Sequence, residues 1–190
     1  MSKYLIVYGT KEGQTARISD RIGGVFRQRG HSADIYDARK IPAGFKFEGY
    51  SGAVIGSSVH MGQYSSPVQQ FVKRYKAQLD RVPSTFFSVS MQAASPTPEE
   101  RTKLDPWIQK FLDKCDWHPK SQESFAGRLA YTQYGWFTKW IMKMINRSKD
   151  PEHAGDTSHD IEYTNWDQVT KFANDFVDRT QGNSNIGTTE

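Results

Sequence analysis

Apolar and polar positions along the chain follow two periods, one typical of buried strands and one typical of amphipathic helices. The first apolar run, Tyr4–Tyr8, is too short for an ordinary helix and rich in β-forming residues, which predicts a strand buried on both faces. Four further runs predict strands over residues 31–38, 52–56, 85–90 and 124–131.

Between these strands, apolar residues recur three or four positions apart, the period of a helix with one buried face. Gly30 is suited to end the first helix, and Pro106 should lie early in the third helix or kink it. The predicted helices span residues 14–29, 67–80, 99–115 and 166–180. The residues expected to face the core are Ile18, Ile22, Val25, Phe26, Val68, Phe71, Val72, Tyr75, Leu79, Leu104, Trp107, Ile108, Phe111, Leu112, Val169, Phe172, Ala173, Phe176 and Val177.

Strands that alternate with helices predict an α/β fold in which helices cover both faces of a parallel sheet. Five strands suit a doubly wound sheet of order 2-1-3-4-5 with right-handed crossovers. Such a sheet binds its ligand at the carboxyl ends of the strands, where strands one and three meet. The loops expected to converge there are residues 10–15, 57–64 and 88–94.

One domain is predicted over residues 1–180, followed by a disordered tail over 181–190. Residues 132–159 separate the fifth strand from the last helix and are too many for an ordinary connection, so they are interpreted as an insertion.

Composition narrows the class of protein. No apolar run is long enough to span a bilayer, and the chain passes directly into its first strand without a signal peptide, which indicates a cytoplasmic protein. The single cysteine, Cys115, excludes an intramolecular disulfide; we expect it to be a packed thiol, and we expect no metal site. The net charge of +4 and the pI of about 9.1 suit an anionic partner, such as nucleic acid, a phospholipid surface or an acidic small molecule.

The loop Thr10-Lys-Glu-Gly-Gln-Thr15 carries the first candidate chemistry. It joins a strand to a helix, so free backbone N–H groups at the helix N-terminus face it, and its two threonines add hydroxyl donors. It has neither the dinucleotide glycine pattern nor a Walker A lysine, and a single phosphate fits it better than a pyrophosphate. From the residues alone, a structural turn with a well-capped helix is an equal alternative.

With this loop and the predicted strand order, the sequence resembles a flavodoxin. The insertion and several local patterns are similar to a narrower group, the flavodoxin-like, quinone-dependent protoporphyrinogen IX dehydrogenases. The patterns that carry this resemblance are Thr10-x-x-Gly-Gln-Thr15, Gly62-x-Tyr64 followed by Phe71-Val-Lys73, Phe87-Ser-Val89, and Trp136 with Ile141-Met-Lys-Met144 and Tyr163-Thr-x-Trp166.

The resemblance implies FMN as the cofactor. It implies that the first loop holds the phosphate, mostly through backbone N–H groups, and that two later loops border the isoalloxazine ring. Tyr64 is then a candidate to stack on the ring, with a partly buried surface tyrosine as the alternative, and Gly62 is a candidate to supply a peptide that flips when N5 is protonated. For His60 we expect a solvated side chain rather than a proton shuttle. The implied cofactor-binding residues are Thr10, Lys11, Glu12, Gly13, Gln14, Thr15, Ser57, Ser58, Val59, His60, Met61, Gly62, Gln63, Tyr64, Ser88, Val89, Ser90, Met91 and Gln92.

The insertion has three interpretations: a covering helix packed on its own domain, a partner-binding face, or an amphipathic element that meets lipid. Packing is favoured slightly over direct substrate contact. The residues that would touch substrate or membrane are Trp136, Lys139, Trp140, Lys143 and Arg147.

The implied function is FMN-dependent dehydrogenation of protoporphyrinogen IX to protoporphyrin IX with a quinone acceptor, in heme biosynthesis. The flavin supplies the redox chemistry, and we expect no obligatory acid–base residue. The implied partners are then a porphyrinogen and a quinone, and no nucleic acid. Peripheral contact with the inner face of the cell membrane is also implied. For the oligomeric state, a homo-oligomer is one option. The alternatives are a flavodoxin-type electron carrier without a substrate of its own, which the basic charge argues against, and an NAD(P)H-linked flavin reductase, for which no second nucleotide loop is visible.

Overall fold

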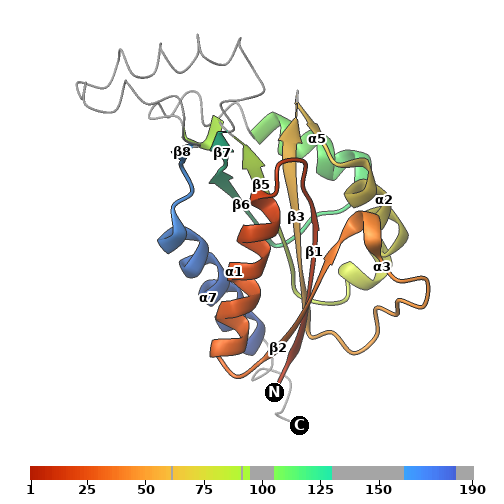
Figure 1. The fold of residues 1–190 in the computed structure, drawn as a ribbon. Coiled ribbons are helices and arrows are strands. Elements are labelled where there is room, and N and C mark those ends of the chain that lie inside the picture. The colour runs from red at the N-terminus through yellow and green to blue at the C-terminus, as the bar shows by residue number, and fades with distance from the viewer. Residues whose placement is uncertain (61, 91, 95–104, 130–160, 183–190) are drawn as a thin grey trace, which may run out of the picture.

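The computed structural model describes residues 1–60, 62–90, 92–94, 105–129 and 161–182. A twisted sheet runs through the centre and helices cover both of its faces (Figure 1). The strands are β1 (Lys3–Gly9), β2 (Ser32–Asp37), β3 (Gly52–His60), β4 (Gln63–Tyr64), β5 (Ser84–Ser90), β6 (Ser121–Ala126), β7 (Arg128–Leu129) and β8 (Ile161–Glu162). The helices are α1 (Gln14–Gln28), α2 (Ser66–Arg74), α3 (Lys76–Leu79), α5 (Asp105–Cys115) and α7 (Trp166–Gly182), with short 3-10 turns η1 (Ala38–Lys40) and η2 (Gln92–Ala94).

The main sheet has the order β2-β1-β3-β5-β6, and all of these strands are parallel. This confirms the predicted order 2-1-3-4-5, since β5 and β6 are the fourth and fifth predicted strands. The short strand β4 folds back antiparallel on the end of β3, and β7 pairs antiparallel with β8 in a separate ribbon. The switch point between β1 and β3 therefore lies where the sequence placed it.

Side chains of β1 alternate between two cores, one on each face of the sheet. Tyr4 and Ile6 belong to the core under α1 and α7, whereas Leu5 and Val7 belong to the core under α2 and α5 (Figure 1). Most predicted inward residues of the helices are buried; Tyr75 and Trp107 pack on the core while partly buried. The predicted inward residue Leu104 lies outside the described residues. The thiol of Cys115 is buried, as predicted, and burial raises its pKa.

Four predicted boundaries are wrong or shifted. Residues 57–60, predicted as loop, continue β3, because β1 and β5 still pair with its residues 57 and 58 and the short strand β4 pairs with residues 59 and 60. The second helix breaks at Tyr75 into α2 and α3. The fifth strand starts at Ser121 and is interrupted by Gly127, and α7 continues to Gly182, two residues into the predicted tail.

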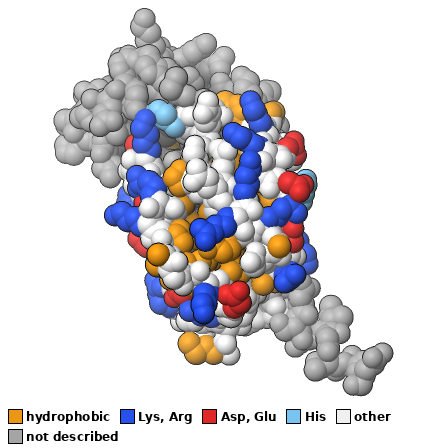
Figure 2. All heavy atoms as spheres, turned by 90° about the vertical axis from the view of Figure 1, so that its right-hand side faces the viewer, with side chains coloured by type: hydrophobic (Ala, Val, Ile, Leu, Met, Phe, Trp, Pro, Cys, Tyr) orange, Lys and Arg blue, Asp and Glu red, His pale blue; other side chains and the backbone are white. Residues whose placement is uncertain are grey.

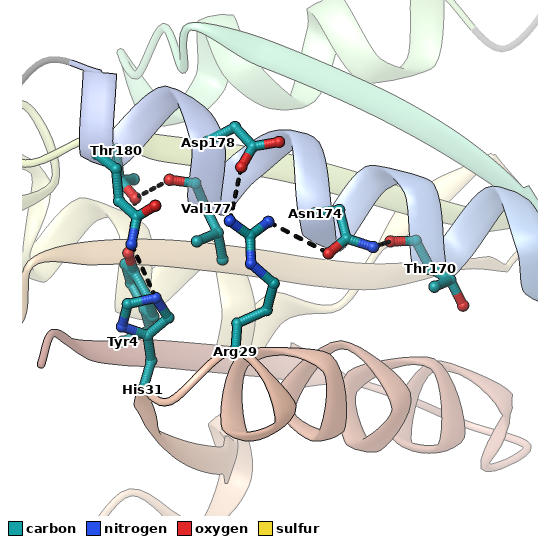
Figure 3. Close-up of polar contacts among 9 residues, drawn as sticks. Tyr4, Arg29, His31, Thr170, Asn174, Val177, Asp178 and Thr180 are labelled. Atoms are coloured by element: carbon teal, nitrogen blue, oxygen red, sulfur yellow. Dashed lines mark hydrogen bonds and ion pairs between the residues drawn. The ribbon is translucent and has the colours of Figure 1, made fainter.

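The C-terminal half of α7 is tied to the start of the chain (Figure 3). The hydroxyls of Tyr4 and Thr180 lie 2.6 Å apart inside the core, and Arg29 forms an ion pair of 2.8 Å with Asp178. Arg29 also donates to Asn174 at 3.3 Å. The element that follows the insertion is thus packed on β1 and α1, which border the predicted site.

Candidate functional site

The loop between β1 and α1 forms the floor of the site. Gly13 stands at the N-cap of α1 with φ +88°, a left-handed conformation that glycine adopts without a steric penalty. No side chain caps this end of the helix, and the Gly13 N–H donates to Thr10 Oγ1 at 2.9 Å. The first turn of α1 thus presents uncapped N–H groups and the positive end of the helix dipole, an arrangement that binds anions.

Thr15 supplies the clearest sign that a ligand belongs here. Its side chain is fully buried, yet its hydroxyl has no hydrogen-bond partner among the described residues. Leaving a buried hydroxyl unpaired costs roughly 1–3 kcal/mol, so such groups normally have a partner. Because Thr15 lines a pocket at the uncapped helix end, a phosphate oxygen bound there would satisfy this hydroxyl.

The carboxyl ends of β3 and β5 close the pocket on the side opposite the β1–α1 loop. Ser58, Val59 and His60 come from β3, and Val89 and Ser90 from β5. The residues that line the pocket are Thr10, Lys11, Glu12, Gln14, Thr15, Ser58, Val59, His60, Val89, Ser90 and Gly127. The structure therefore brings together residues of all three predicted loops.

Gly127 is a lining residue that the sequence interpretation missed. It follows β6, accepts a hydrogen bond from the Tyr163 N–H at 3.3 Å, and donates to the Ser90 carbonyl at 3.1 Å. A glycine inside a predicted strand often marks a break or a close backbone approach, and that signal was present in the sequence.

The serines of the predicted site use their side chains within the protein. Ser57 Oγ accepts from the Ser65 N–H at 3.1 Å, Ser88 Oγ accepts from the Tyr64 hydroxyl at 2.9 Å, and Ser90 Oγ accepts from the Ala93 N–H at 3.3 Å. With these side chains already used inside the protein, the backbone groups of Ser57, Ser88 and Ser90 are the better candidates for contacts to a ligand.

Stacking of Tyr64 on a flavin was a wrong prediction. Its ring is only 6% exposed and packs between Phe86 and Phe111, with ring centroids 5.5 and 4.9 Å away. Burial raises the pKa of Tyr64 to about 12. The β3–β4 hairpin turns this side chain into the core, because Gln63 and Tyr64 are successive strand residues and point to opposite sides.

The other residues of the 57–64 and 88–92 segments are only partly described. Gly62 has φ +73° and approaches the ring of Trp107, and Gln63 is exposed on β4. Gln92 begins η2. Met61 and Met91 lie outside the described residues, as do the predicted contact residues of the insertion, Trp136, Lys139, Trp140, Lys143 and Arg147.

His60 is half-buried rather than simply solvated, and it is joined to the first loop. Lys11 Nζ lies 2.8 Å from His60 Nε2, a hydrogen bond that spans the pocket from the phosphate loop to the end of β3. An ammonium group can only donate, so Nε2 is the acceptor in this contact and the ring proton is on Nδ1.

A second polar network, also missed from sequence, joins α1 to β8. Gln14 Nε2 donates to Glu162 Oε1 and to Thr164 Oγ1, both at 2.8 Å, and Thr164 in turn donates to the Ala126 carbonyl at 2.8 Å. Arg17 donates to Gln14 and forms an ion pair of 3.1 Å with Glu162. The strand on which the chain returns from the insertion is thus bonded to the first turn of the phosphate-loop helix.

A doubly wound sheet with an uncapped helix N-terminus and a pocket at its switch point defines a flavodoxin-like protein. Residues 5–156 match the family described as Flavodoxin domain. The chain is 34% identical over 179 residues to the protoporphyrinogen IX dehydrogenase [quinone] of Escherichia coli (strain K12), with 94% of this chain and 96% of that protein covered. A relative of the same name from Leishmania major is 30% identical over 179 residues, with 92% and 74% covered.

The chain therefore belongs to the flavodoxin-domain family and, within it, to the family of relatives named protoporphyrinogen IX dehydrogenase [quinone], as the sequence resemblance predicted. Among solved structures, it is similar to oxidised Flavodoxin 2 from Bacillus cereus, with a TM-score of 0.50, 15% identity, and 94% and 99% of the two chains covered. At that identity the likeness shows the fold alone.

Proposed function

We propose that this protein is an FMN-dependent oxidoreductase that dehydrogenates protoporphyrinogen IX to protoporphyrin IX and passes the electrons to a quinone. The observation that carries the proposal is the unpaired Thr15 hydroxyl at the uncapped N-terminus of α1, inside a pocket where three loops meet. The relatives named for this reaction are 34% and 30% identical to this chain over 94% and 92% of its length, which supports the choice of substrate and acceptor.

The residues present suit the phosphate end of FMN. Backbone N–H groups of the loop from Thr10 to Thr15 and the Thr15 hydroxyl would hold the phosphate, and Gly13 permits the backbone to come close. The ends of β3 and β5, at residues 57–60 and 88–90, would border the ring through backbone groups, since three of their serine side chains are already paired within the protein.

When bound, FMN supplies the redox chemistry. The chain contributes binding, orientation and exclusion of water, and no side chain is assigned as an obligatory acid or base. The Gly62 peptide remains a candidate to respond to the flavin's protonation, because glycine has no Cβ and can leave or enter its present φ of +73° without a steric penalty.

The insertion is proposed to contact substrate or membrane through Trp136, Lys139, Trp140, Lys143 and Arg147. Its flanks support this assignment, because β7 and β8 pair with each other and Gly127, the residue before β7, lines the pocket. The chain therefore leaves and re-enters the domain beside the proposed flavin site.

Peripheral contact with a membrane would give the enzyme access to a lipid-dissolved quinone. Among the described helices, none is long and apolar enough to cross a membrane. Figure 2 shows Lys and Arg side chains, with Asp and Glu among them, spread over the face that carries α2, α3 and α5, and anionic lipid would attract its basic residues. Exposed basic residues there are Lys73, Arg74, Lys110 and Lys114.

One assay tests the proposal. The purified protein is loaded with FMN, given protoporphyrinogen IX and a menaquinone analogue, and porphyrin fluorescence is followed. We expect turnover that requires both FMN and the quinone. Flavin that is reduced only by a partner reductase would point to an electron carrier instead, and a protein that does not bind FMN would refute the proposal.

A deletion separates the two roles of the insertion. Because Leu129 and Ile161 are paired neighbours, a short linker can replace residues 135–159. We expect this variant to bind FMN and to lose turnover. Loss of folding would show instead that the insertion packs on its own domain.

A further inference from the structure

The hydrogen bond between Lys11 and His60 places a cation and an imidazole side by side on the wall of the pocket. Lys11 belongs to the loop after β1 and is exposed, whereas His60 ends β3 and is half-buried. Both residues line the pocket, and their nitrogens lie 2.8 Å apart. A carboxylate placed between Lys11 Nζ and His60 Nε2 would accept a hydrogen bond from each, with the imidazole in the tautomer that carries its proton on Nε2.

The positive charge of Lys11 is not matched by an acid in the described part of the chain. No ion pair there includes Lys11; its ammonium is hydrogen-bonded to His60 Nε2. Glu12 also lines the pocket, but no ion pair joins it to Lys11. The charge is therefore available to an anion that enters the pocket.

The flavin phosphate does not require this charge. The uncapped first turn of α1 and the Thr15 hydroxyl already provide its donors, and the Lys11 side chain points to His60 instead. The charge of Lys11 therefore suits a second anion. This anion would bind in the pocket while the flavin phosphate occupies the first turn of α1.

We propose that Lys11 and His60 form a carboxylate subsite that anchors a propionate of the tetrapyrrole substrate; this inference rests on the proposed function. The carboxylate replaces the direct contact between the two side chains: it accepts one hydrogen bond from Lys11 Nζ and a second from His60 Nε2, with the ring proton on Nε2 instead of Nδ1. Porphyrinogen carboxylates lie on one edge of an otherwise apolar macrocycle, so holding that edge at Lys11 and His60 fixes how the macrocycle faces the flavin. The pair acts in positioning and specificity, not in the redox step.

The test compares a diacid with its diester. Binding of protoporphyrin IX and of its dimethyl ester to the FMN-loaded protein is measured by fluorescence quenching, and KM is measured for the two corresponding porphyrinogens. We expect Lys11→Met and His60→Gln each to weaken binding of the diacid by about tenfold, as for one lost charge-assisted hydrogen bond, and to change the diester by less than about twofold. FMN affinity is measured separately in each variant.

A matched control is Lys120→Met, which removes the same charge from an exposed lysine just before β6, at the opposite end of the sheet. We expect it to leave the diacid-to-diester ratio unchanged. An equal loss in this control would mean that net charge alone acts, and would overturn the subsite.

Two further results would overturn it: a wild-type protein that binds diacid and diester equally, or a Lys11→Met variant that loses FMN affinity while keeping the diacid-to-diester ratio. A different result would refute the proposed function. Wild-type protein that selects the diacid through Lys11 but shows no turnover would retain the subsite and refute the dehydrogenase.

Discussion

Gln14 and Glu162, 148 residues apart in the chain, are joined by a hydrogen bond of 2.8 Å that links the phosphate-loop helix to β8. Gln14 is 5% exposed, and its second amide proton is donated to Thr164 at 2.8 Å. Both protons of a buried amide are therefore satisfied by the segment that follows the insertion. The first turn of α1, which presents the anion site, is thereby held in place by the far end of the chain.

Glu162 variants test this link. Glu162→Gln keeps an acceptor for Gln14 and loses only the partly exposed ion pair with Arg17, so we expect a loss of unfolding free energy under about 1 kcal/mol. Glu162→Ala leaves a buried N–H of Gln14 without a partner, which should cost roughly 1–3 kcal/mol. Urea unfolding with an unchanged m-value measures both, and equal losses would refute the role of the amide.

Thr15→Val separates the phosphate from the rest of the flavin. Valine keeps the shape of the side chain and removes the unpaired hydroxyl, so the apo protein should be as stable as the wild type or more stable. FMN affinity should fall by about tenfold to a hundredfold, the effect of one hydrogen bond to a charged group, whereas riboflavin, which lacks the phosphate, should bind as before. Flavin fluorescence titration measures both ligands. An equal loss for riboflavin would place the effect outside the phosphate contact.

Tyr64→Phe tests the assignment of Tyr64 to the core. Removing the phenolic hydroxyl leaves the buried Ser88 Oγ without its bond, so stability should fall by about 1 kcal/mol. The absorption spectrum of bound flavin and the FMN affinity should stay unchanged, because the ring packs on Phe86 and Phe111. A shifted flavin spectrum in this variant would return Tyr64 to the cofactor site.

Periodicity predicted most of the scaffold because burial dictates it. Apolar residues spaced three or four apart mark the buried faces of α1 and α7, and the wholly apolar run of β1 marks a strand covered on both sides. The strand order followed from the alternation of strands and helices, and the loop between β1 and α1 followed from its small and polar residues.

The misplaced features are those that depend on distant partners. Ser57 and Ser58 have the polarity of a loop, but they continue a central strand because Gly9 and Ser88 lie on either side of Ser57. Tyr64 lies in a polar segment, which favours an accessible side chain, and only the pairing of β4 with β3 shows that the ring points into the core. Nothing near Glu162 in the sequence indicates its bond to Gln14, since polar pairs of large separation leave no periodic signal.

Gly9 is expected to tolerate no side chain. A Cβ at this position would lie 2.6 Å from Ser65 Cβ and from Val68 Cγ2, where the end of β1 meets the start of α2. Gly9→Ala should therefore destabilise the protein by about 1–3 kcal/mol through overpacking. Gly24→Ala is the matched control, because a Cβ there meets nothing within 4 Å and alanine favours the helix by about 0.5–1 kcal/mol. Thermal unfolding of both variants checks the opposite signs, and a neutral Gly9→Ala would contradict the close approach.

His31 should make stability depend on pH. Burial, then the N-terminal ammonium and Arg29, lower the pKa of this imidazole, which accepts a hydrogen bond from the Ser2 N–H and lies beside Tyr4 (Figure 3). Because the unfolded chain binds the proton more readily, the contribution of His31 is complete above the ordinary histidine pKa of about 6.5. It is lost as the pH falls from there through the lowered value.

The comparison is made between wild type and His31→Gln, by urea unfolding at about pH 7.5 and about pH 5.5, on either side of the ordinary histidine pKa. Carboxylates titrate in both proteins, so only the difference between the two slopes reports on His31. We expect the wild type to lose more stability than the variant over this interval, since only the wild type must accommodate a proton on a buried ring. Parallel pH profiles would show that the folded protein accepts a charged imidazole at this position, and burial would then not govern its titration.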